Sequence, residues 1–136
     1  MRVPLSWLRD FAPIEVPTDE LTSVLNELGL IVDGVERIGE GLGDVVVARV
    51  TDIRSIPGAD RIRLVTVDAG GDPVDVVCGA WNFEVGDLVP LAPVGTVLPN
   101  GLEIARRKMR GVVSNGMLCS PSELRLADDS AGLLVL

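Results

Sequence analysis

The sequence predicts a mainly β protein with small α segments, in which a five-stranded barrel follows a short helical N-terminal segment. Several short runs rich in β-branched residues follow residue 44, and glycine-rich turns separate them. Before them, one apolar stripe repeats at helical spacing. Three glycines between residues 39 and 43 indicate a hinge. We therefore expect a helical segment at 1–38, an incomplete subdomain, and a barrel domain at 39–136.

The N-terminal segment is predicted to contain two helices. Ser6 can cap a short helix, which ends before Pro13 because the residue preceding proline avoids helical geometry. Thr18 is a favourable N-cap for the second helix, and Gly29 suits the position after its end. The apolar stripe of this helix consists of Leu21, Val24, Leu25 and Leu28. The segment is too small for its own core, so we expect the stripe to pack on other protein.

The barrel is predicted from alternation and turn chemistry. Gly-Gly at 70–71 indicates a hairpin, because glycine supplies the positive φ of tight hairpin turns. The expected strands are residues 45–53, 61–68, 74–77, 88–93, a short 102–104, and 117–119. A small five-stranded barrel is typical of the OB-fold, whose face and loops bind oligonucleotides. An SH3-like barrel fits the pattern nearly as well.

A helix is predicted at the end of the barrel. Ser120 fits the N-cap, Pro121 the first helical position, and Glu123 can complete a capping box. The sequence then stops inside an apolar run at 132–136. We interpret this ending as the mark of a fragment of a longer protein.

The charge distribution indicates one candidate binding surface. The net charge is −8, whereas nucleic-acid binders are usually basic because phosphate neutralisation supplies much of their affinity. Cations nevertheless cluster near residue 108. If the chain binds RNA, we expect phosphate contacts from Arg61, Arg63, Arg106, Arg107, Lys108 and Arg110, and polar loop contacts from Asn82 and Ser114. The alternative is an ordinary solvated surface.

Catalysis by this chain is not expected. It has no histidine, which removes the commonest general base and metal ligand, so we predict no catalytic residue and no metal site. Cys78 and Cys119 are expected to be buried free thiols. Aromatic residues make up 3%, too few for a stacking platform of several rings, so we expect Trp81 in the core or at the rim. No apolar run is long enough to span a membrane, and we expect a cytoplasmic protein.

Two sets of motifs stand out along the chain. The barrel motifs are Pro57-Gly58-Ala59-Asp60-Arg61, Val77-Cys78-Gly79-Ala80-Trp81-Asn82, Leu98-Pro99-Asn100-Gly101, and Arg110-Gly111 through Ser114-Asn115-Gly116-Met117-Leu118-Cys119-Ser120 to Glu123-Leu124. The N-terminal motifs are Val3-Pro4-Leu5-Ser6-Trp7-Leu8, Leu28-Gly29-Leu30 and Val35-Glu36. By the first set, the barrel portion resembles the tRNA-binding domain shared by several synthetase-associated proteins. By the second set, the start of the chain resembles the β subunit of bacterial phenylalanine–tRNA ligases.

The resemblance implies an OB-fold inserted after a short segment that packs on chain following the barrel. It implies part of an α2β2 enzyme that joins phenylalanine to its tRNA with ATP and magnesium. In that family the α subunit carries the aminoacylation site, and editing lies further along the β subunit. This fragment is then expected to bind or position tRNA, or to act as a scaffold, with no role in catalysis and no DNA partner.

The chain departs from the family pattern at three positions. Ile56 stands where the family often has histidine, Trp81 where it tends to have proline, and Arg125 where it tends to have glycine. Two alternative functions stay open at this point. One is a stand-alone small tRNA-binding protein of the same domain family, and the other is a protein-interaction module that dimerises through the apolar stripe.

Overall fold

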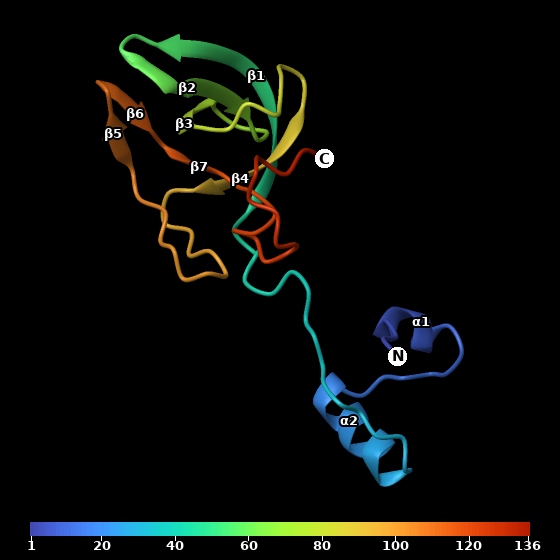
Figure 1. Cartoon of the computed structure of the whole chain (residues 1–136). Coiled ribbons are helices and arrows are strands. Elements are labelled where there is room, and N and C mark those ends of the chain that lie inside the picture. Colours follow the sequence, from blue (N-terminus) through green and yellow to red (C-terminus); the bar gives the residue numbers. More distant parts are fainter. The chain divides into compact units, whose positions relative to one another are not determined.

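The computed structural model describes residues 1–136 and divides into two compact units, Met1–Glu36 and Arg37–Leu136 (Figure 1). The first, the helical unit, contains α1 (Leu5–Arg9) and α2 (Thr18–Glu27). The second, the barrel unit, contains all seven strands. No helix of the chain has the length and apolar content needed to span a membrane.

The two helices begin slightly earlier than predicted. Pro4 and Pro17 occupy the N-cap positions, so Ser6 and Thr18 lie inside the helices and make no capping hydrogen bond. The predicted C-terminal signal is confirmed: Gly29 follows α2 with φ of 83°, a conformation that glycine adopts without a Cβ clash. None of residues 1–36 is buried.

The barrel unit confirms the predicted mainly β fold. Five antiparallel strands run in the order β3-β2-β1-β4-β7. Their bounds are β1 Val46–Ile56, β2 Ala59–Asp68, β3 Val74–Cys78, β4 Leu88–Pro93 and β7 Gly116–Leu118. Two hydrogen bonds nearly close the barrel between β3 and residues 114–115, which lead directly into β7. The amide of Val77 donates to Ser114 Oγ at 2.9 Å, and the amide of Asn115 donates to the carbonyl of Asp75 at 2.9 Å.

Alternating small and β-branched apolar residues of β1 and β2 fill the core. Ala48 and Val50 of β1, and Val65 and Val67 of β2, have their side chains inside the barrel. A second cluster lies where the chain passes from β4 to the segment after β7. Its buried members are Ala92, Leu98, Ile104, Cys119 and Leu124.

Two sequence predictions were wrong. Residues 102–104 form no strand; a single bridge pairs Val97 with Glu103. Instead, β5 (Arg107–Met109) and β6 (Val112–Ser114) form a hairpin.

The predicted helix at Pro121 is a succession of turns. The capping box does form, since the Ser120 amide donates to Glu123 Oε2 at 2.6 Å. The turn then stops because Arg125 takes a φ of 51°, and the amide of Leu126 bonds back to the carbonyl of Pro121 at 3.0 Å. The sequence therefore contains a signal for the start of a helix at Ser120, but the backbone at Arg125 ends the helical turn at once.

Candidate functional site

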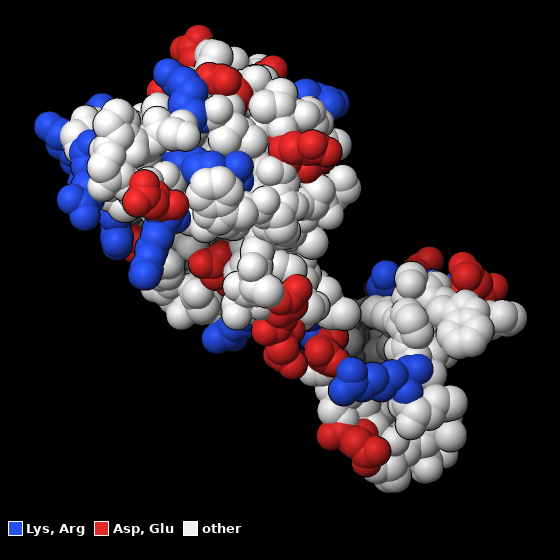
Figure 2. All heavy atoms as spheres, turned by 45° about the horizontal axis from the view of Figure 1, so that its top comes forward, with Lys and Arg blue, Asp and Glu red and all other residues white.

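The cationic cluster lies on the β5–β6 hairpin and on Arg106 directly before it, which together we call the basic hairpin. Its four exposed cations are Arg106, Arg107, Lys108 and Arg110. Arg110 and Gly111 form the two-residue turn with φ of 49° and 82°, the backbone form that keeps paired strands twisting together. Figure 2 shows Lys and Arg side chains gathered at the left edge of the barrel unit, where Figure 1 places β5. No hydrogen bond or ion pair engages the charged groups of the four.

The two candidate arginines on β2 have different surroundings. Arg61 is exposed. Arg63 is half-buried: its Nη2 donates to the carbonyl of Ala80 at 2.8 Å. Its guanidinium carbon lies 4.3 Å from the ring centroid of Trp81 and 4.8 Å from that of Phe83. Arg61 is therefore available to a ligand, whereas Arg63 is engaged within the domain.

The two candidate polar contacts also have partners inside the barrel. Asn82 donates from Nδ2 to the carbonyl of Leu133 at 2.9 Å and accepts from the amide of Leu133 at 2.9 Å. Ser114 is 3% exposed, and its hydroxyl both accepts from Val77 and donates to the carbonyl of Gly116 at 3.0 Å. These bonds link β3 and the loop after it to the last third of the chain.

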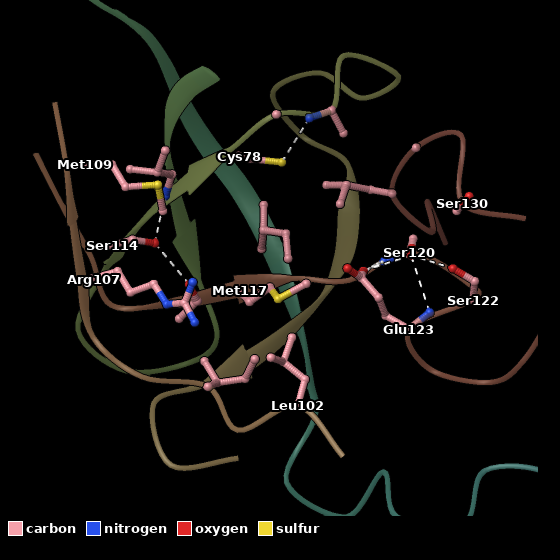
Figure 3. A pocket seen from close by; sticks show the side chains of 18 of the residues that line it. Cys78, Leu102, Arg107, Met109, Ser114, Met117, Ser120, Ser122, Glu123 and Ser130 are labelled. Carbon is pink, nitrogen blue, oxygen red and sulfur yellow. Dashed lines mark hydrogen bonds between the residues drawn. The ribbon is translucent and has the colours of Figure 1, made fainter. Parts of the chain in front are cut away.

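A cleft of about 490 Å³ opens beside the basic hairpin (Figure 3). Ala80, Arg107, Met117 and Glu123 are among the residues that line it. Figure 3 shows Arg107 and Glu123 on opposite sides with Met117 between them. Glu123 Oε2 also accepts from Ser120 Oγ at 2.8 Å. The volume is in the range that holds a small organic group such as a nucleobase.

The two cysteines are free and buried, as predicted. Burial, together with a smaller effect of the nearby Glu123 carboxylate, raises the pKa of the Cys119 thiol to about 12. Burial also raises the pKa of the Cys78 thiol. Both thiols are therefore neutral near pH 7, and a neutral thiol is a poor nucleophile. No group of three or more acidic or cysteine side chains is placed to hold a metal ion.

Comparison with known families identifies the barrel. Residues 45–136 match the family model described as "Putative tRNA binding domain". This match covers about two thirds of the chain and begins one residue before β1.

The whole chain also aligns with longer curated proteins. It is 48% identical over 136 residues to "Phenylalanine--tRNA ligase beta subunit" of Syntrophotalea carbinolica and 47% identical over 137 residues to the protein of that name from Anaeromyxobacter dehalogenans. Each alignment covers 100% of this chain and 17% of the relative. The chain thus spans about a sixth of the length of these relatives.

Among solved structures, an RNA ligase of Naegleria gruberi superposes with a TM-score of 0.49 at 18% identity. That superposition covers 65% of this chain and 31% of the ligase. It is too weak a likeness to carry any conclusion.

Proposed function

The chain belongs to the tRNA-binding domain family, and from this premise we propose that it binds and positions tRNA as the N-terminal part of a phenylalanine–tRNA ligase β subunit. The observation that carries the proposal is the basic hairpin, which presents four unpaired cations on a family domain. The identity of 47–48% over the full chain supports the choice of parent protein.

The hairpin offers an electrostatic basis for binding despite the acidic total. A bound phosphate interacts mainly with nearby charges, because salt screens the interaction between exposed charges beyond about 8 Å at physiological ionic strength. Four cations within five consecutive positions therefore act together, while most of the acidic side chains lie elsewhere in the sequence. We assign phosphate contacts to Arg106, Arg107, Lys108 and Arg110.

The remaining candidates receive different roles. Arg61 is exposed and joins the phosphate contacts. Arg63 positions aromatic rings, because its guanidinium lies over two of them. RNA contacts by Asn82 and Ser114 stay a prediction, and we favour a structural role for both, since their side chains bond within the barrel.

The rest of the proposed enzyme supplies the chemistry. The parent protein would join phenylalanine to tRNA in the cytoplasm, using ATP and magnesium, as an α2β2 tetramer with its α subunit. No residue of this chain is assigned to those cofactors. The helical segment 1–38 would pack on chain that follows the barrel domain 39–136, which gives its exposed stripe a partner.

A protein-interaction role is the second candidate. It is favoured by the helical unit, in which Phe11 is 81% exposed and Leu28 is 71% exposed. An apolar surface of this kind is covered in most functional assemblies. The two roles are compatible, since they use different units.

A salt series tests the tRNA proposal. Binding of tRNA to the chain is measured from low to physiological salt, with Arg106→Ala/Lys108→Ala beside Arg2→Ala/Arg9→Ala. The two double variants lose equal charge, so a general charge effect cancels between them. Each phosphate neutralised contributes about 0.7–0.9 to the slope of log affinity against log salt. In the hairpin variant the magnitude of this slope is expected to fall by about 1.4–1.8. In the control variant the slope is expected to stay the same. Absence of binding by the folded chain, or an equal loss in the control, overturns the proposal.

A further inference from the structure

Trp81 is the large aromatic side chain at the rim of the barrel, and it is 61% exposed. It follows β3 in the loop that leads to Phe83, which is buried. A single exposed apolar residue needs no explanation by itself. The residues around Trp81, however, hold its ring in place and carry positive charge.

Arg63 supports the indole from one side. Its guanidinium lies over both the Trp81 and Phe83 rings, at 4.3 Å and 4.8 Å from their centroids. The hydrogen bond from Arg63 to the carbonyl of Ala80 ties it to the residue before Trp81. A cation over an aromatic face is attracted by the ring quadrupole. The indole is thus held in place while much of its surface stays open to solvent.

Exposed cations lie on elements close to the loop that carries Trp81. Gly79, two residues before Trp81, lies beside β2, since a Cβ added there would be in ordinary contact with the carbonyl oxygen of Arg61 at 3.5 Å, and the Arg61 side chain is exposed. Gly79 and Ala80 also line the cleft that Arg107 of the basic hairpin borders. Trp81 therefore directly follows two residues of a cleft that Arg107 also lines.

We propose that Trp81 stacks on an unpaired base of the bound RNA, with Arg61 and Arg107 contacting phosphates on either side of that base. This inference rests on the proposed function and names the part of the RNA that the domain takes: a single-stranded loop, bulge or end. Bases inside a duplex have both faces covered by neighbours, whereas unpaired bases can stack on a side chain.

The test uses the intrinsic fluorescence of Trp81. The chain contains two tryptophans, and Trp7 in α1 is 57% exposed, so Trp7→Phe leaves Trp81 as the single reporter with little effect on folding. The variant is titrated with tRNA, with a short single-stranded RNA, and with an abasic strand of the same length. Quenching by the first two, without quenching by the abasic strand, is the expected result.

Affinity provides the second measurement. Trp81→Leu is expected to weaken binding of tRNA and single-stranded RNA by about 5- to 150-fold, the fold-change that corresponds to one base–aromatic stack. Its slope against salt should not change, because no phosphate contact is lost. Trp81→Phe should recover most of the affinity, and Trp7→Leu should have no effect.

The outcomes separate the two proposals. Salt-dependent tRNA binding with no quenching, and with equal affinity for wild type and Trp81→Leu, overturns the stacking proposal and leaves the proposed function intact. No tRNA binding by the folded wild-type chain overturns both. If Trp81→Leu fails to fold, fluorescence of the Trp7→Phe chain still decides the question.

Discussion

The helical unit and the barrel unit are both rich in apolar residues, but only the barrel unit buries them. In the barrel, Val65, Val67 and Val76 have no exposed surface. In the helical unit no residue is buried, and Leu28 is 71% exposed. The apolar stripe of one short helix needs a second element to pack against. A closed sheet needs none, because its strands face one another across the barrel interior. Apolar content therefore predicts a core only where the topology brings two surfaces together.

The largest expected effect tests this difference directly. Leu91→Ala in β4 removes a side chain that is 2% exposed and should lower the free energy of unfolding by about 2–5 kcal/mol, since it loses burial and leaves a cavity. Leu25→Ala in α2 should change it by less than about 0.5 kcal/mol. Urea unfolding followed by circular dichroism measures both. An equal loss in the two variants would show that the units unfold as one.

An intermediate effect is expected at the link between β3 and the end of the chain. Asn82→Ala removes two hydrogen bonds to Leu133 and should cost about 1–3 kcal/mol of unfolding free energy. Asn100→Ala is the control, because Asn100 is a loop residue that accepts one local bond from the amide of Leu102. If Asn82→Ala instead kept full stability and weakened tRNA binding, Asn82 would be an RNA contact.

The smallest expected effect concerns the residue that ends a helical turn in each unit. Gly29 after α2 and Arg125 after the Pro121 turn both have positive φ, at 83° and 51°. An L-residue in that region costs about 1–2 kcal/mol, and glycine avoids it. Arg125→Gly should therefore raise barrel stability by about 1 kcal/mol, measured by thermal unfolding. Gly29→Arg should lower helicity instead, and a loss of stability in Arg125→Gly would contradict the backbone argument.

The strands were predictable because each carries its own pattern. Residues 45–53 are rich in β-branched residues, residues 61–68 largely alternate apolar with polar residues, and glycine occupies the turns. Pro57-Gly58 was expected within a longer loop, yet β1 and β2 extend to Ile56 and Ala59, so the turn is the two residues alone. Sequence pattern thus identified the elements better than their ends.

The basic hairpin was missed for a physical reason. Its turn carries arginine where asparagine or aspartate is usual, and three of the four residues before that turn are cations. Nothing in this run alternates, because the hairpin is largely exposed. The same applies to Arg63, whose partners Trp81 and Phe83 lie about twenty residues away and meet it only through the pairing of β2 with β3. Local patterns cannot report such contacts.

The bond between Asn82 and Leu133 joins residues 51 positions apart, which has a consequence for the nascent protein. A ribosome adding about 5–20 residues per second needs about 3–10 s to synthesise that interval. Throughout it, the side chain of Asn82 lacks the backbone groups of Leu133 with which it later bonds. The loop after β3 is therefore completed late in synthesis, and until then chaperones or premature aggregation can act on the unfinished barrel.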